Sequence, residues 1–138
     1  MRLGPSNKTG ARRGAVAVEM AVAAPFLFLM FLVACDYCRV YYAAQIVTNA
    51  ARSGALYASG TVPAASGLSP LQAAQQAAVA EGVSINLQPA HVSVTTSTSS
   101  AAVTVTYPFQ VINPYLGLPP TLNLSATVTM PLSSWATR

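Results

Sequence analysis

Two cysteines separated by two residues are the first side chains of this sequence whose types and spacing could do chemistry. Cys35-Asp36-Tyr37-Cys38 has the C-x-x-C spacing of a redox disulfide. A redox pair of this kind opens a helix that follows a strand, because the helix N-terminus lowers the pKa of the thiol. Here the two cysteines interrupt a helical pattern that begins near Ala15. Two structural thiols or an intermolecular bridge are the simpler interpretations, and a C-x-x-C redox protein stays an alternative.

The rest of the chemical inventory is small. The chain has three acidic residues and one histidine among 138 residues, too few for a metal cage or for an acid–base pair on the usual patterns. We therefore expect no catalytic residue, no metal site, no cofactor, no small-molecule substrate and no enzyme activity.

The net charge of +4 comes from the N-terminus, where four of the seven basic residues lie before position 14. Beyond that point each basic residue is balanced by an acid: Arg39, Arg52 and Arg138 against Glu19, Asp36 and Glu81. A body without a basic patch cannot neutralise phosphates, so the sequence argues against nucleic-acid binding.

The elements that must position these residues begin with an apolar run from Ala15 to Cys35, in which Glu19 is the only charge. A bilayer core of about 30 Å requires roughly 20 such residues in a helix. The basic pair Arg12-Arg13 precedes the run and predicts a cytoplasmic N-terminus. We expect a cytoplasmic leader over residues 1–14, a transmembrane helix over 15–35, and the remaining chain on the other side of a single-pass membrane protein.

Glu19 requires an explanation, because an ionisable side chain in hydrocarbon costs about 2.5–3.5 kcal/mol. Cleavage after Gly14 would give Ala15 a free amine, and in an assembly of staggered subunits this amine could pair with Glu19 of a neighbour. The basic–Gly pattern, followed by four apolar residues and Glu, resembles the signal of type IV pilins and pseudopilins, which prepilin peptidase cleaves. By this resemblance Gly14 and Ala15 flank the cleavage site and Glu19 is the assembly carboxylate.

A second resemblance competes with the first. Leu32-Val33-Ala34-Cys35 resembles the lipobox of bacterial lipoproteins, which would make the apolar run a signal peptide and Cys35 a lipid-anchored residue. The length of the run, Glu19 and Pro25 inside it, and a helical pattern that continues through Cys35 argue against this alternative.

Past Cys35 the helical pattern continues. Apolar and small residues recur at steps of three and four: Tyr37, Val40, Tyr41, Ala44, Val47, Ala51, Gly54, Ala55 and Ala58. This periodicity predicts that residues 36–59 continue the helix outside the membrane, with one face against a head domain. A continuous helix from Ala15 to Ala58 would be roughly 66 Å long, about twice the bilayer core. Pro25 lacks the N–H for a helical hydrogen bond and predicts a kink or local unwinding.

Residues 60–138 are predicted to form a small α+β head. Ser69, Pro70 and Gly82 mark a short helix at about 70–81, with Ser69 as its N-cap. After it, apolar residues alternate with Thr and Ser, which predicts antiparallel strands at about 83–87, 91–97, 101–107 and 121–130. Ser97 to Ser100 is expected to be a hairpin turn and Pro108 to Pro120 a longer loop. The predicted fold is α+β, a long helix packed on a small antiparallel sheet.

The sequence from Arg12 to Ala58 resembles the N-terminal domain of the TadE-like family, the pseudopilins of tight-adherence (Flp-type) pilus systems. Four features carry the resemblance: the Gly14-to-Glu19 start, Pro25 in the apolar run, the step from Asp36 to Arg39, and Asn49-Ala50-Ala51-Arg52 near the end of the helix. The stretch from Val103 to Met130 is similar to the strand–loop–strand ending of many members, so the resemblance covers nearly the entire chain.

The resemblance implies a pilin-like minor component of a pilus or secretion apparatus in the bacterial inner membrane. Its partners would be other pseudopilins or pilin subunits, prepilin peptidase and the inner-membrane platform of the pilus. Asp36, Arg39, Asn49 and Arg52 are candidates for contacts between subunits. The simplest alternative for Asp36 and Arg39, three apart on one helical face, is an ion pair within the chain.

Overall fold

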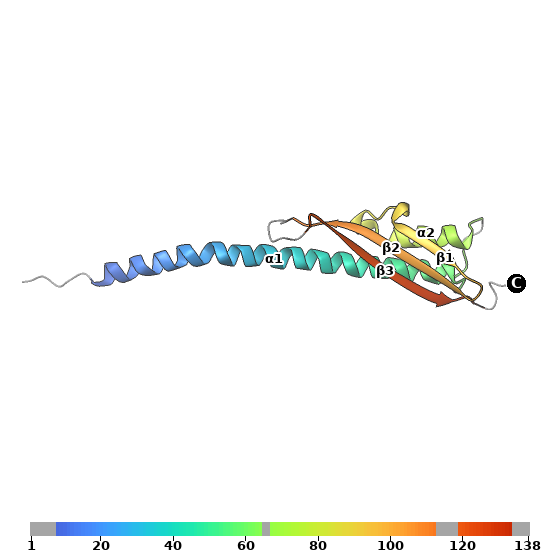
Figure 1. Cartoon of the computed structure of the whole chain (residues 1–138), viewed down its shortest axis with the longest axis horizontal. Helices are drawn as coiled ribbons and strands as arrows, with labels where there is room; N and C mark the ends of the chain where they lie inside the picture. The colour runs from blue at the N-terminus through green and yellow to red at the C-terminus, as the bar shows by residue number, and fades with distance from the viewer. Residues whose placement is uncertain (1–7, 65–66, 113–118, 134–138) are drawn as a thin grey trace, which may run out of the picture. The chain divides into compact units, whose positions relative to one another are not determined.

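The computed structural model describes residues 8–64, 67–112 and 119–133, with side chains from Gly14 onward. Within these residues, two α-helices, two short 3-10 helices and three strands follow one another. Figure 1 labels the α-helices and the strands. Their bounds are α1 Lys8–Ala58, α2 Pro70–Glu81, η1 Val83–Ile85, η2 Pro89–His91, β1 Val92–Thr96, β2 Ser100–Gln110 and β3 Thr121–Pro131. A long apolar helix together with a three-stranded antiparallel sheet confirms the predicted α+β class.

The chain divides into two compact units, residues 1–37 and 38–138. The first contains most of α1, and the second, which we call the head unit, contains the end of α1 and all later elements. Pro25 lies inside α1, and the helical backbone continues on both sides of it. Local unwinding at Pro25 is therefore not observed, and the kink expected there stays a prediction.

The sheet of the head unit has the strand order β1-β2-β3, with both neighbouring pairs antiparallel (Figure 1). Its core side consists of cross-strand apolar pairs such as Val103 with Val128, and Val105 with Ala126. Its other side is rich in hydroxyl residues, and the Oγ1 atoms of Thr104 and Thr127 lie 2.8 Å apart. The alternation of apolar and hydroxyl residues predicts these two faces, and the structure has them.

Strand β2 extends through Pro108 to Gln110, further than the predicted end at 107. A proline is tolerated there because β1 pairs with β2 only as far as Val105. The carbonyl of Ser100 faces β1, where it accepts the N–H of Ser97 (2.7 Å). Residues two apart in a strand direct their backbone groups to the same side, so Pro108, eight residues after Ser100, also faces the side of β1. β1 has ended before this point, so no partner strand requires the N–H that Pro108 lacks. Of the predicted loop from Pro108 to Pro120, residues 113–118 lie outside the described residues.

The strand predicted at 83–87 is wrong. Residues Val83–Ile85 form the 3-10 helix η1, and Asn86 follows in the left-handed conformation, with φ of 56°. This tight turn places Leu87 in the core, 3% exposed, beside Gly82. The alternating apolar residues of this segment therefore belong to a turn and not to a strand. The turn buries Leu87 and leaves Val83 72% exposed.

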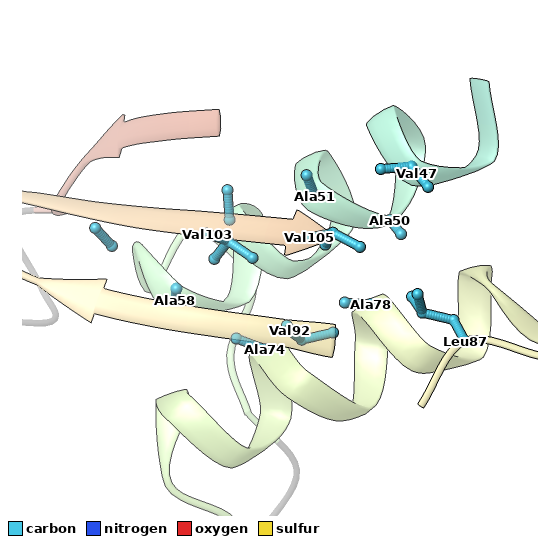
Figure 2. Packing of buried hydrophobic residues seen from close by; sticks show 12 residues of the cluster. Val47, Ala50, Ala51, Ala58, Ala74, Ala78, Leu87, Val92, Val103 and Val105 are labelled. Atoms are coloured by element: carbon cyan, nitrogen blue, oxygen red, sulfur yellow. The ribbon is translucent and has the colours of Figure 1, made fainter. Parts of the chain in front are cut away.

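The core of the head unit lies between the end of α1, helix α2 and the sheet (Figure 2). Small residues of the helices face the valines of the strands, and Val103 and Val105 are completely buried. The backbone of α1 closely approaches both α2 and β2 at Gly54, because a Cβ atom there would lie 3.1 Å from the carbonyl oxygen of Ala74 and from Cγ1 of Val103. The small-residue stripe of α1 thus permits close packing of the helix on α2 and on the sheet.

The predicted buried stripe of α1 is correct from Val47 to Ala58 and wrong at its beginning. Tyr37 and Tyr41 are exposed at 71% and 58%, whereas Ala43 and Ala50, outside the predicted stripe, are buried. A helical period alone does not tell which turns of a helix its neighbours cover, and in the head unit full burial on α1 begins at Ala43.

Candidate membrane-spanning and assembly segment

Gly14, Ala15 and Glu19 lie within α1, and all three are exposed. A Cβ atom added at Gly14 would meet nothing within 4 Å. The side chains around them are apolar and equally exposed, for example Val16 at 58%, Val18 at 64% and Met20 at 61%. The predicted cleavage site and the predicted assembly carboxylate are thus accessible on one helix.

This exposed apolar surface continues through the rest of the first unit, where Val22, Phe26, Leu27, Phe28, Leu29, Met30 and Phe31 are all more than half exposed. The helix from Gly14 onward is long and apolar enough to cross a membrane. A surface of this size is unfavourable in water and indicates contact with lipid or with other proteins. Glu19 and Pro25 both lie within it.

Cys35 is half-buried and Cys38 exposed, and both are free thiols. Both belong to the interior of α1 rather than to its first turn. No helix N-terminus is therefore available to stabilise a thiolate at either sulfur, as a redox C-x-x-C requires. The helix also continues past Cys35 without a flexible tether.

The four candidates for subunit contacts differ in exposure. Asp36 is 8% exposed, whereas Arg39, Asn49 and Arg52 are exposed. Asp36 and Arg39 both have interaction partners. Asn49 and Arg52 share the outer face of α1 with Gln45 and Thr48, opposite the buried stripe. Within the head unit, Asn49 and Arg52 therefore lie on a face of α1 that is open to a second subunit.

Arg39 lies on an aromatic surface that its sequence context does not predict. Its guanidinium carbon is 5.1 Å from the centre of the Phe109 ring, a cation–π distance. An open groove at this point is lined by Arg39, Tyr42, Ala43, Ser84, Ile85, Asn86, Tyr107 and Phe109. Only the tertiary structure brings these three chain segments together. Tyr107 and Phe109, at and just beyond the end of a predicted strand, were a signal that this end differs from the other.

The described residues contain no group of three or more His, Cys, Asp or Glu side chains that could hold a metal ion. His91 is engaged within the head unit, where its Nδ1 accepts the backbone N–H of Gln88 (3.3 Å). Its ring meets Tyr107 edge-on, with ring centres 6.1 Å apart.

The fold and this segment define a protein class: a small α+β unit that follows one helix suited to span a membrane. Residues 14–56 match the model of the TadE-like protein family. The resemblance predicted from the sequence is thereby confirmed for this segment. The match begins at Gly14 and ends before α2, so residues 57–138 lie outside it. No curated protein and no solved structure matches the chain significantly.

Proposed function

We propose that this protein is a pseudopilin-type structural subunit of a tight-adherence pilus or of a related secretion apparatus. The observation that carries the proposal is the family match over residues 14–56. The match starts at the glycine that would end a prepilin leader and includes Glu19, the single carboxylate of the apolar run from Ala15 to Cys35. Both features are accessible on α1.

In the proposed mechanism, prepilin peptidase cuts between Gly14 and Ala15 on the cytoplasmic side of the inner membrane. The new amine of Ala15 and the carboxylate of Glu19 on a neighbouring subunit then neutralise each other within the apolar layer. A charge in hydrocarbon is tolerated when it is paired, so each pairing aligns one helix against the next. The chain performs no reaction of its own.

Other pseudopilins or pilin subunits and the inner-membrane platform are the proposed partners. The outer face of α1 supports this assignment, because Asn49 and Arg52 lie exposed on it, opposite the stripe that packs in the head unit. The head unit would lie on the extracytoplasmic side, at the membrane or within the pilus.

The decisive experiment is to purify the protein from membranes of its own cells and to determine its mature N-terminus and mass. The proposal requires a chain that begins at Ala15. A chain that begins at a lipid-modified Cys35 would establish the lipoprotein alternative, and an intact leader would remove the prepilin assignment.

Gly14 offers a substitution that separates processing from folding. Gly14→Val should block cleavage, because the peptidase reads this position, while the fold is kept because a side chain at residue 14 has open space around it. Full processing of Gly14→Val would contradict the assigned cleavage site.

A further inference from the structure

The exposed large apolar side chains of the head unit gather at one end. Among the described residues from 38 onward they are Tyr41, Tyr42, Leu71, Val83, Ile112 and Leu122. All but Leu71 belong to the end at which α1 enters the head unit. We call Tyr41, Tyr42, Val83, Ile112 and Leu122 the apolar end.

Contacts within the head unit bring Tyr42, Val83 and Leu122 to the same region. The groove beneath Arg39 joins Tyr42 of α1 to Ser84, the neighbour of Val83, and to Phe109 of β2. Phe109 is directly opposite Leu122 in the sheet.

Ile112 follows two residues after the end of β2, where the N–H of Val111 donates to the carbonyl of Pro120 (3.1 Å). One helix, one turn and the two residues directly after β2 thus contribute to one surface.

We propose that the apolar end is a membrane-contacting surface, which inserts into the interfacial layer of the bilayer that α1 crosses. The proposal rests on the proposed function only in that it requires the apolar part of α1 to be the membrane span. It adds a second attachment, made by the head unit itself.

The position of the apolar end along the chain argues for lipid as its partner. Tyr41 is six residues beyond Cys35, the end of the apolar run, which is about 9 Å along a helix. The interfacial layer extends about 5–8 Å beyond the hydrocarbon core. Helical side chains lean toward the helix N-terminus, so the rings of Tyr41 and Tyr42 reach back to this level. Tyrosine is enriched at this depth because it has an apolar ring and a polar hydroxyl.

The chemistry of the neighbouring groups agrees with this partner. Arg39 is exposed above Phe109, an arrangement in which an arginine packs its stem on apolar surface and presents its charge at the level of lipid phosphates. The sequence from Val111 to Thr121 contains no charged residue. The segment after β2 therefore brings no charge that would oppose entry into the interfacial layer.

The test uses the full-length chain in vesicles of phosphatidylcholine and phosphatidylglycerol. In a Cys35→Ser, Cys38→Ser background, a nitroxide is attached at Ile112→Cys or, as the matched control, at Ser97→Cys. Ser97 is exposed at the other end of β2, about 30 Å away along an 11-residue strand. Collision rates with oxygen and with a water-soluble nickel complex report whether each label lies in lipid or in water.

We expect the oxygen-to-nickel ratio at residue 112 to exceed that at residue 97 by several fold, independently of the protein-to-lipid ratio. Equal, water-like ratios at both sites in protein that floats with the vesicles would overturn the proposal and leave the membrane span intact. Shielding of residue 112 that increases with protein density would also overturn it, in favour of contact between copies. Protein that fails to float with the vesicles would instead contradict the membrane span of the proposed function.

Discussion

At the scale of single residues, the charges of this protein carry most of the functional argument because there are so few of them. Glu19 is the one carboxylate in an exposed apolar surface, Asp36 is buried, and Glu81 is exposed at the end of α2. A carboxylate that must enter hydrocarbon needs a partner, whereas an exposed one in water does not. Glu81 is therefore a matched control for Glu19.

Glu19→Gln should leave the protein in the membrane and impair its assembly. Loss of a buried ion pair costs about 3 kcal/mol, which weakens the association of subunits about a hundredfold. Surface piliation, measured by electron microscopy and by sheared-pilus yield, should decrease sharply in this variant and remain normal in Glu81→Gln. Normal piliation with Glu19→Gln would remove the role assigned to this side chain.

At the scale of elements, the two ends of α2 are fixed in different ways. The capping box of α2 is local: the Ser69 hydroxyl accepts the N–H of Gln72 (3.3 Å), and the Gln72 side chain accepts the N–H of Ser69 (3.2 Å). The turn after α2 depends instead on a tertiary contact, because Gly82 leaves room for the buried Leu87. A methyl group at residue 82 would lie 2.4 Å from Cβ of Leu87.

Gly82→Ala should destabilise the head unit by about 1–3 kcal/mol, the usual cost of overpacking a core. Thermal unfolding of the full-length protein in detergent, followed by circular dichroism, should show a lower Tm. Gly14→Ala is the matched control, since its added methyl group meets no atom within 4 Å. Equal Tm values for the two variants would mean that the turn over Val83–Ile85 adapts freely.

At the scale of the whole molecule, one covalent chain combines an exposed apolar helix with a packed head unit. The head unit is held by its core and by backbone contacts such as that of Ser59, whose carbonyl accepts both the N–H and the hydroxyl of Ser133 (3.0 and 3.1 Å). This contact ties the chain after β3 to the end of α1. Neither Cys35 nor Cys38 forms a disulfide within the chain.

Replacement of both cysteines, Cys35→Ser with Cys38→Ser, should leave membrane anchorage, Tm and piliation unchanged. The physical reason is that neither thiol closes a bridge and that both lie inside a continuous helix. Flotation with vesicles and thermal unfolding check the first two properties, and a pilus assay checks the third. Release of the double variant from the membrane would favour lipid anchoring at Cys35, and loss of a thiol-dependent activity would favour the redox alternative.

The sequence by itself determined the features that depend on local chemistry or on strict periodicity. Three such features could be predicted because each follows from neighbouring residues. They are the apolar run, the capping of α2 by Ser69 and Pro70, and the alternation that forms β1, β2 and β3. The segment that matches the TadE-like family was readable for the same reason, since its signals from Gly14 to Arg52 lie along one helix.

Only the tertiary structure decided the features that depend on which surfaces meet. It decided that Val83–Ile85 turns to bury Leu87 and that Pro108 continues β2 beyond the end of β1. It also decided that Tyr41 stays exposed, two residues before burial of α1 in the head unit begins at Ala43. It also placed Arg39 over Phe109, seventy positions later in the chain. These outcomes come from contacts between segments that are distant in the chain. Such contacts change the environment of a residue, and the sequence around that residue does not predict them.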